Sequence, residues 1–380
     1  METKTANRIT KLDGLRGLLS LVVCLNHSFM AVAIPTFANV WQQNPLIFHD
    51  LQAKLQQLFM LLGNGGAAVT LFFLLSGFVL GPSLAKVKMN FSGLLSFIVK
   101  RLVRLYPVYL LIVLLTALYM KTGFVYQTFP SSSEWFNWWM NFQMTFKEFI
   151  LNAFFIHTYL GGVTWTLRVI LIVSLIFPLF FILSKKTTWW MDILVVLSLI
   201  YLSFTILNFG DNFRDLRYLY MFYLGLSIPK FRSFFSILPN WFAWLFLPPA
   251  TLVLLGFRYL TDQYLGGVVE SLISFFLIGI SVYGTKITTL NFLESKILLF
   301  FGKISYSLYL IHFSVLYLLT RLMFIYLPNL PFSANYFLIH LMLFFVSTIL
   351  ATGVSILVYR FIELPSQKLA GRLGEKISAT

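Results

Sequence analysis

The chain has 380 residues, of which 59% are hydrophobic and only 11% are charged, and its mean hydropathy is +0.83. A soluble globular domain carries roughly a quarter charged residues, so this composition excludes a water-soluble protein. The 42 Phe and 18 Tyr, without a Gly-X-Y period or a heptad repeat, also exclude disordered, collagen-like and coiled-coil chains. What remains is an all-α polytopic membrane protein.

Ten apolar runs approach or reach the length of about 17 to 25 residues that spans a ~30 Å hydrocarbon core. They predict membrane helices over residues 15–34, 67–82, 104–120, 164–183, 190–207, 216–229, 234–256, 267–284, 305–327 and 335–359. No loop between them is long enough for a second soluble domain. We therefore expect a single membrane domain over 1–380, with a helical core from about 12 to 365 and a short cytoplasmic tail, 366–380.

The positive charges indicate how these helices are oriented, because Lys and Arg concentrate in cytoplasmic loops. With the N-terminus inside, 20 of the 28 basic residues fall in cytoplasmic segments and 8 on the other side, so both termini are predicted to be cytoplasmic. The net charge of +15 then reflects topology and attraction to anionic membrane lipid. The basic residues are scattered over short loops, which argues against nucleic acid as a partner.

The longest loop, from about 121 to 163 on the outer side, carries Trp135, Trp138 and Trp139. This composition predicts an amphipathic helix lying in the membrane interface, where aromatic rings form a belt. A sugar-stacking platform is the alternative interpretation. The five histidines form no HExxH motif and the single cysteine, Cys24, allows no CxxC, so we expect no metal site.

Two ionisable residues share one face of the first apolar run. Arg16 and His27 are eleven residues apart, and eleven steps of about 100° bring the second residue back to within about 20° of the first. If Arg16 marks the cytoplasmic interface, His27 lies about 16 Å deeper. Ionisable side chains are costly in a bilayer and suggest function, so His27 is a candidate catalytic residue. A hydrogen-bonding clasp between helices is the structural alternative.

A second group of basic residues begins the third run, in the sequence KRLVRLYP. Arg101 and Arg104 are three residues apart and project from nearly one face of a helix. Guanidinium groups match phosphate oxygens bidentately, so this pair, together with Arg16, predicts a phosphate site that opens to the cytoplasm. The positive-inside rule alone would also place basic residues here.

Five stretches resemble, in order, motifs of the acyltransferase 3 family of integral membrane acyltransferases. LDGLRGLLSLVVCLNH resembles the family's motif of Arg, ten residues and His, and RLVRLYP resembles its Arg-x-x-Arg motif. GNGGAAVTLFFLLSGFVL is similar to the Gly-rich entry into helix two, FGKISYSLYLIHF to the ISYSLYLxH motif, and YRFIELP to the closing Arg-x-x-Glu-x-Pro. The matching residues of the last three stretches are Phe72, Phe73, Ser76, Gly77, Phe78, Ser305, Tyr306, Tyr309, His312, Arg360, Glu363 and Pro365.

The resemblance implies about ten membrane helices and an enzyme that transfers acyl groups other than amino-acyl groups. Its donor would be acetyl-CoA or another acyl-CoA on the cytoplasmic side. Its acceptor would be a hydroxyl of a cell-surface carbohydrate or glycolipid, as in O-acetylation of polysaccharide or lipopolysaccharide at a bacterial inner or plasma membrane. Arg16, Arg101 and Arg104 would then hold the phosphates of coenzyme A, and His27 would act as general base. An acyl-enzyme intermediate is an alternative route.

Six further residues are candidates for supporting roles. For His312, hydrogen bonding between helices and a role beside the thioester are equally open. Glu363 is either a local salt-bridge partner of Arg360 or part of the donor site. The six candidates are Ser76, Trp165, Ser305, Tyr306, His312 and Glu363.

One position departs from the family pattern. In TWTLRVI, Trp165, Thr166 and Leu167 match the start of the central helix, but Ile170 stands where the family often has Glu. Glu363 or Glu270 could substitute for this carboxylate, or the activity could be altered. Two other functions therefore stay open: a membrane transporter or flippase, and a catalytically altered scaffold. The two halves of the chain lack matching interrupted helices, which weighs against a transporter. The sequence sets no oligomeric state.

Overall fold

The computed structural model describes residues 10–34, 50–206 and 211–379. Within these ranges the regular secondary structure is helical, and an isolated bridge joins Val32 to Ser132. Seven of the described helical segments are long and apolar enough to cross a membrane. These findings confirm an all-α, multi-pass membrane protein. The count of ten spans and the cytoplasmic location of the termini stay predictions.

Most of the predicted runs correspond to one helix each. The end of the fifth run, 207, lies outside the described residues. The helices are α1 (Thr10–Ser28), α3 (Gly65–Ala85), α4 (Phe91–Thr122), α7 (Thr164–Lys186), α8 (Trp189–Thr205), α11 (Asn240–Leu260), α12 (Gln263–Tyr283), α13 (Lys296–Tyr326) and α14 (Phe332–Val358).

Three of the predictions differ from the structure. The first run was expected to continue to 34, but α1 ends at Ser28 and Val32 instead pairs with Ser132. The run 216–229 is not one helix: the 3-10 helices η4 (Asp211–Tyr218) and η5 (Ile228–Phe231) flank α9 (Leu219–Ser227). In the run 234–256, Pro239 separates α10 (Arg232–Ile237) from α11, because proline lacks the N–H that a helix interior needs.

The structure also contains helices that hydropathy did not indicate. α2 (Leu51–Leu62) precedes α3, and α15 (Leu364–Ala379) occupies the predicted tail. The loop from 121 to 163 contains two short helices, α5 (Glu134–Trp138) and α6 (Phe146–Ala153), instead of one amphipathic helix. These elements carry too many polar residues, or are too short, to be found as apolar runs.

The chain's internal contacts group it into two compact units. The first unit contains Met1–Leu21, Gly66–Pro82 and Phe180–Ser305. The second contains Val22–Gly65, Ser83–Leu179 and Tyr306–Thr380. Helices α1, α3, α7 and α13 contribute residues to both.

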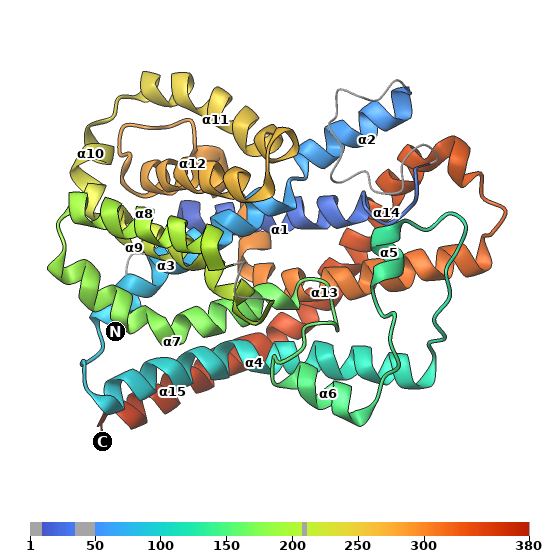
Figure 1. The fold of residues 1–380 in the computed structure, drawn as a ribbon, viewed down its shortest axis with the longest axis horizontal. Coiled ribbons are helices and arrows are strands. Elements are labelled where there is room, and N and C mark those ends of the chain that lie inside the picture. The colour runs from blue at the N-terminus through green and yellow to red at the C-terminus, as the bar shows by residue number, and fades with distance from the viewer. Residues whose placement is uncertain (1–9, 35–49, 207–210, 380) are drawn as a thin grey trace. The chain divides into compact units, whose positions relative to one another are not determined.

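In the first unit, glycines let helices touch backbone to backbone. A Cβ atom added at Gly77 of α3 would lie 2.1 Å from the carbonyl oxygen of Phe222 in α9. Conversely, a Cβ atom at Gly225 would lie 2.1 Å from the carbonyl oxygen of Leu74. Small residues allow such close helix packing inside membranes. The same unit contains the antiparallel pair α11 and α12, which lie side by side (Figure 1).

Two buried ion pairs stabilise the first unit. Asp192 of α8 accepts a hydrogen bond from the Tyr223 hydroxyl at 2.7 Å and lies 2.6 Å from the Lys230 ammonium, so it connects α8 to the middle of α9 and to η5. The second pair joins α11 to α12. There Arg258 Nε donates to Glu270 at 2.9 Å and Arg258 Nη2 contacts the other carboxylate oxygen.

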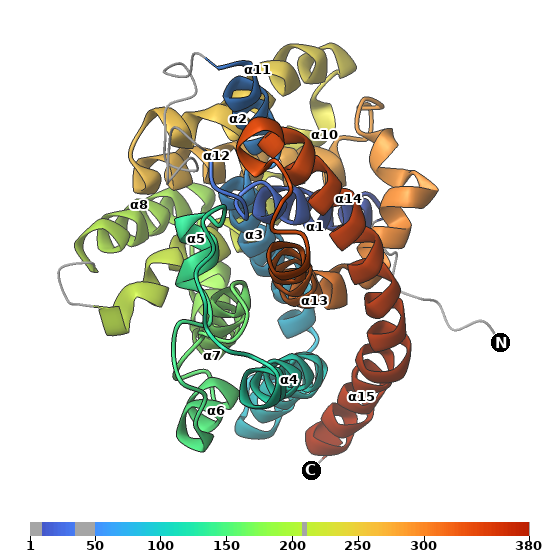
Figure 2. The ribbon, with the colours of Figure 1, turned by 90° about the vertical axis from the view of Figure 1, so that its right-hand side faces the viewer.

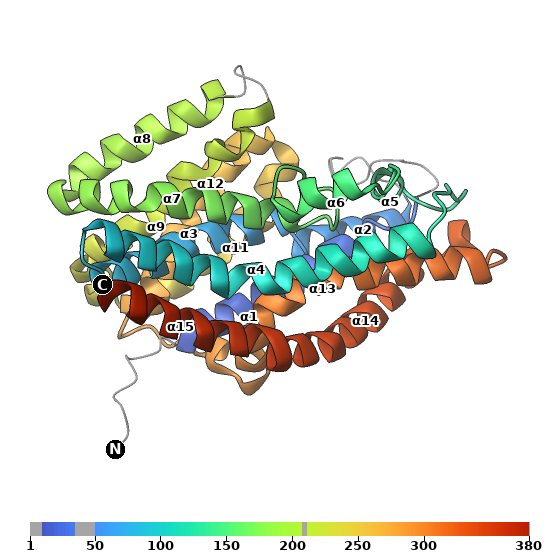
Figure 3. The ribbon, with the colours of Figure 1, turned by 90° about the horizontal axis from the view of Figure 1, so that it is seen from below.

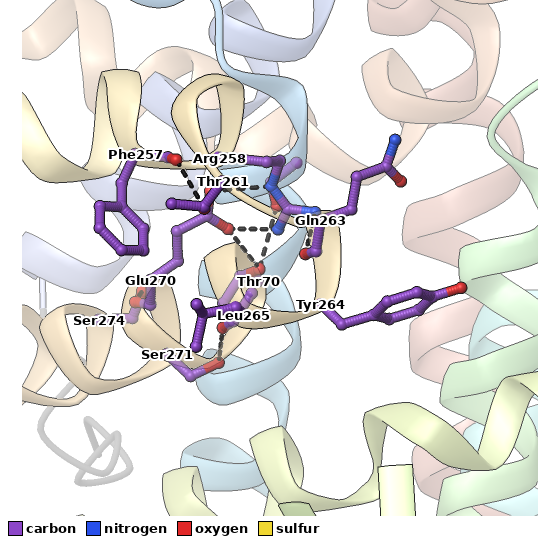
Figure 4. Close-up of polar contacts among 12 residues, drawn as sticks. Thr70, Phe257, Arg258, Thr261, Gln263, Tyr264, Leu265, Glu270, Ser271 and Ser274 are labelled. Carbon is purple, nitrogen blue, oxygen red and sulfur yellow. Dashed lines mark hydrogen bonds and ion pairs between the residues drawn. The ribbon is translucent and has the colours of Figure 1, made fainter. Parts of the chain in front are cut away.

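The Arg258–Glu270 pair makes further polar contacts with residues of the same unit (Figure 4). Thr70 of α3 lies 3.2 Å from the Glu270 carboxylate, and Arg258 Nη1 donates to the Gln263 carbonyl at 3.3 Å. A Cβ atom at Gly66 would lie 2.7 Å from Arg258 Nε, so glycine leaves the space that the guanidinium occupies. The Glu270 side chain is 0% exposed, so these contacts replace the water that its carboxylate loses on burial.

In the second unit, α15 lies along α4 (Figures 1 and 3). Ser96 of α4 donates to the Gly374 carbonyl at 2.7 Å. Figure 2 shows α14 continuing into α15, and the π-helical turn Tyr359–Glu363 joins them. Also in this unit, Asp50 accepts a hydrogen bond from the Tyr336 hydroxyl and caps α2 by accepting one from the Ala53 N–H, and these bonds lower the pKa of the Asp50 carboxyl.

The buried pair predicts a non-additive stability effect. Glu270→Leu or Arg258→Met alone should lower the free energy of unfolding by about 3–5 kcal/mol, because each leaves one charge buried without its partner. The double variant should lose much less than the sum, because it removes both charges. Chemical unfolding of the purified protein in detergent measures all three. If the double variant lost as much free energy of unfolding as the two single variants together, a direct interaction would be contradicted.

The predicted topology can be tested by labelling single cysteines. Cys24 is buried, so it should give little background. Cysteines at Lys88 and Lys186, both exposed, should react from the cytoplasmic side, and one at exposed Lys147 should react from the outer side. Labelling with a membrane-impermeant maleimide, before and after permeabilisation, gives the answer. Reaction of Lys88→Cys and Lys147→Cys from the same side would show that the number of crossings between them is even.

Candidate active site

Two histidines from distant parts of the sequence meet in the second unit. His27 lies in the last turn of α1, and His312 lies in α13. Nδ1 of His27 is 2.9 Å from Nε2 of His312, and the two ring planes differ by only 3°. The predicted run 15–34 places His27 inside a helix. In the structure α1 ends at Ser28, so His27 lies at the end of a helix. Its alternative role as an interhelical hydrogen-bonding group is therefore present in the structure.

Aromatic rings surround His27. Trp135 of α5 stacks on it with ring centroids 5.4 Å apart, and Phe313 meets it edge-on at 5.9 Å. Behind them, a Cβ atom at Gly162 would lie only 2.5 Å from the Phe313 ring, so the turn before α7 fixes that ring closely. His312 is 3% exposed, whereas His27 is half-buried. His27 is thus the more accessible member of the pair.

The contact between Trp135 and His27 was not predicted. The sequence placed the three tryptophans of the long loop in a membrane belt or a sugar platform, and no local spacing related them to His27. Trp138 is exposed, as either interpretation requires, but Trp135 is partly covered.

The two arginines of the Arg-x-x-Arg stretch lie one turn apart on α4. Arg101 is half-buried and its Nε donates to the Ser174 hydroxyl of α7 at 3.3 Å, while Arg104 is exposed. The hydroxyl of Tyr306 donates to the Leu105 carbonyl and lies within electrostatic range of both guanidinium groups. The structure therefore brings two of the predicted motifs together.

Other candidate residues make local contacts. In the first unit, Arg16 lies 3.9 Å from the Asp13 carboxylate on its own helix. The hydroxyls of Ser76 and Ser305 donate to the carbonyls of Phe72 and Gly302, three or four residues earlier. These contacts satisfy hydroxyl groups in an apolar helix and point to no ligand.

In the second unit, Glu363 contacts residues other than those expected. It accepts hydrogen bonds from the Ser307 hydroxyl at 2.6 Å and the Gln367 amide at 3.0 Å. Arg360, its expected partner, is exposed and lies over the Phe361 ring. The π-helical turn supplies this placement, because it changes which side chains share a face with the helix that follows.

The start of α7 contacts the ISYSLYL stretch. Trp165 is half-buried, and the hydroxyl of Thr166 beside it lies 3.1 Å from the Tyr309 hydroxyl. Further along α7, the carbonyl of Ile170 accepts a hydrogen bond from the Ser174 hydroxyl at 2.7 Å. Ser174 is also the residue that Arg101 contacts.

Among the described residues, the side chain that hydrogen-bonds to His27 is His312 and not a carboxylate. The oxygens of Glu270 accept from Arg258 and Thr70. Those of Glu363 accept from Ser307 and Gln367. The position beside the His27 ring that a carboxylate would fill in a carboxylate–histidine dyad is therefore filled by a second imidazole.

The described residues contain no group of three or more His, Cys, Asp or Glu that could hold a metal ion. The second unit contains a half-buried imidazole held by a second imidazole, an arrangement that could accept a proton. One turn apart on α4, two guanidinium groups could bind an anion.

Comparison with known proteins covers the first four of the five motifs and reaches the start of the fifth, at Arg360. The sequence model of an acyltransferase domain family matches residues 9–360, which is nearly the whole chain and includes both arginine motifs and both histidines of the pair. No similar curated protein and no similar solved structure was found. The match, the membrane-spanning helices and the order of the motifs show that the chain belongs to the acyltransferase 3 family and is an integral membrane acyltransferase.

Proposed function

We propose that this protein moves an acyl group, most simply acetyl, from a cytoplasmic acyl-CoA to a hydroxyl of a cell-surface carbohydrate or glycolipid. The membrane would be a bacterial inner or plasma membrane. The observation that supports this most strongly is the His27 ring, which is half-buried, flanked by aromatic rings and, among the described residues, hydrogen-bonded only through Nδ1. Such a ring in an acyltransferase suits general base catalysis.

The donor would be held through its phosphates. Coenzyme A carries its phosphates at one end of a long pantetheine arm and its thioester at the other. Arg101 and Arg104 offer two guanidinium groups one turn apart, and the exposed Arg104 is free to meet a ligand from solvent. Arg16 lies eleven residues before His27 on α1, about 16 Å along the axis, which is a distance that a pantetheine arm can cover.

The reaction then needs one proton carrier. His27 removes the proton of the acceptor hydroxyl while the oxygen attacks the thioester carbon. The carbon–sulfur bond breaks, an ester forms, and the proton on His27 passes to the coenzyme A thiolate. The products are the acylated acceptor and free coenzyme A, with His27 returned to its neutral form.

The direct test is incubation of the purified protein with radiolabelled acetyl-CoA and extracts of cell-surface polysaccharide. We expect label in a carbohydrate fraction and stoichiometric release of coenzyme A. Movement of a substrate across vesicles without thioester consumption would instead indicate a transporter or flippase. Neither activity, with acyl-CoA still bound, would indicate a catalytically altered scaffold.

The donor site predicts a specific loss of affinity. Arg101→Ala or Arg104→Ala should weaken coenzyme A binding by roughly ten- to a hundred-fold, because hydrogen bonds to charged groups contribute about 1.5 to 3 kcal/mol each. Isothermal titration calorimetry with coenzyme A measures this change. Lys121→Ala, an exposed cation at the other end of α4, is the matched control and should bind normally. Unchanged affinity in a folded double arginine variant would leave these residues with a topological role only.

The general-base role predicts that His27→Ala loses turnover and keeps donor binding. General base catalysis supplies roughly 10² to 10⁴-fold, so kcat should fall by about that factor. His27→Gln should fail too, because an amide forms hydrogen bonds but takes no proton at neutral pH. His157→Ala, which removes a histidine paired with Glu148 in the loop before α7, is the control. Full activity of His27→Ala would refute the mechanism, and an active Gln variant would show that His27 only positions the acceptor.

A further inference from the structure

We propose that His312 is a positioning residue that holds His27 with its proton on Nδ1, so that the lone pair of Nε2 is the base. This inference rests on the function proposed above, because it concerns the same ring. It goes further by assigning which nitrogen acts and which residue decides it.

The hydrogen bonds set the protonation of His312 first. Its Nδ1 lies 3.1 Å from the carbonyl oxygen of Leu308, four residues earlier in α13. A carbonyl oxygen can only accept, so Nδ1 of His312 carries a proton. In the neutral ring, the other nitrogen, Nε2, is then an acceptor.

The same reasoning then sets the protonation of His27. Its Nδ1 lies 2.9 Å from Nε2 of His312. Two acceptors would not approach so closely, so Nδ1 of His27 donates the proton of this hydrogen bond. Nε2 of His27 is left with its lone pair. Both partners come from the second unit, and no other ring nitrogen of the described residues contacts this pair.

The neutral form of His312 follows from its surroundings. Its side chain is 3% exposed, and its ring contacts are with His27 and Tyr309. A second proton would bury a cation against another imidazole, and no carboxylate of the described residues contacts either ring. Burial of an unpaired charge is costly.

A second histidine of the same unit has its proton on Nδ1 for the same reason, and both of its ring nitrogens hydrogen-bond to backbone groups. His340 of α14 is 0% exposed, and its Nδ1 lies 2.7 Å from the carbonyl of Tyr336, again four residues earlier. Its Nε2 accepts from the backbone N–H of Val32 at 3.3 Å. Because an amide N–H can only donate, this ring has its proton on Nδ1. His312 uses the same anchor, with His27 in the place of the Val32 amide.

The chain of hydrogen bonds has a consequence for catalysis. When Nε2 of His27 takes the acceptor's proton, the ring becomes a cation and its bond to His312 becomes charge-assisted and stronger. An interaction that strengthens as charge develops lowers the barrier. A carboxylate does this in a carboxylate–histidine dyad; here a neutral imidazole fixed to the Leu308 carbonyl does it, in a chain that has Ile170 where the family often has Glu.

The tautomer can be observed directly. The protein contains only five histidines, so ¹⁵N-histidine labelling and solid-state NMR in bilayers give a spectrum that single His→Gln variants can assign. We expect His27, His312 and His340 to have a protonated Nδ1 and an unprotonated Nε2. In His312→Phe, His27 should lose the signature of a hydrogen-bonded Nδ1–H. A His27 ring protonated on Nε2 in the unmodified protein would overturn the proposal.

Kinetics give a second, independent readout. His312→Phe should lower kcat by about ten- to a hundred-fold, which corresponds to loss of a hydrogen bond to a charged group, and should leave the affinity for acyl-CoA unchanged. His312→Gln should retain more activity, because its amide oxygen can accept the same proton. His340→Phe is the matched control: it removes a buried histidine with the same carbonyl anchor, but it should not change kcat.

The outcomes separate the two levels of the proposal. If His27→Ala is fully active, the general-base function fails. If His27→Ala is inactive but His312→Phe turns over as fast as His340→Phe, only the positioning role fails. Should His312→Phe fold poorly, the Gln variant and the NMR spectrum of the unmodified protein still decide the question.

Discussion

The interior of a bilayer offers no water, so the backbone groups and most of the polar side chains that this chain places there find their partners within the chain. This requirement explains the helices, and it also explains the details of their side chains. Hydroxyl groups donate hydrogen bonds to carbonyls of the preceding helical turn, as Ser28 and Thr70 do. The Arg258 guanidinium pairs with Glu270, and the Asp192 carboxylate accepts a hydrogen bond from Tyr223 and pairs with Lys230. Even His312 and His340 use a carbonyl of their own helix.

The same requirement shapes the candidate active site. A ring that must take up a proton cannot have both nitrogens satisfied by the protein, and among the described residues His27 has a hydrogen-bond partner at Nδ1 and none at Nε2. The aromatic rings of Trp135 and Phe313 enclose it without offering a competing acceptor for the proton. His312 is more deeply buried, and both of its ring nitrogens have a hydrogen-bond partner. The pair thus consists of one ring with both nitrogens in hydrogen bonds, His312, and one ring whose Nε2 has no partner among the described residues, His27.

Hydropathy predicted the long helices well, because α4, α7, α12 and α14 are apolar over lengths close to the membrane thickness. It missed α2, whose Gln56 and Gln57 are polar yet buried, and it could not show that the run 216–229 is broken. The Arg16, His27, Arg101 and Arg104 candidates followed from spacing within single helices. The partner of His27 did not, because His312 lies 285 residues away and only folding brings the rings together. The Arg258–Glu270 pair was hidden for a similar reason, since it crosses the turn between two helices.

Helix α9 has a consequence for how the protein is made. It is nine residues long, about 13 Å, which is less than half the thickness of a ~30 Å hydrocarbon core, and all its side chains are buried. Such a segment is too short to span the core by itself, and its flank η4 carries Arg214, Asp215 and Arg217, which are costly to place in lipid. Its neighbours α3 and α8 are synthesised before it, but α12, which also contacts it, is synthesised after it. Membrane insertion of this part of the chain must therefore wait for tertiary packing, and biogenesis of the first unit is completed only once α12 has emerged.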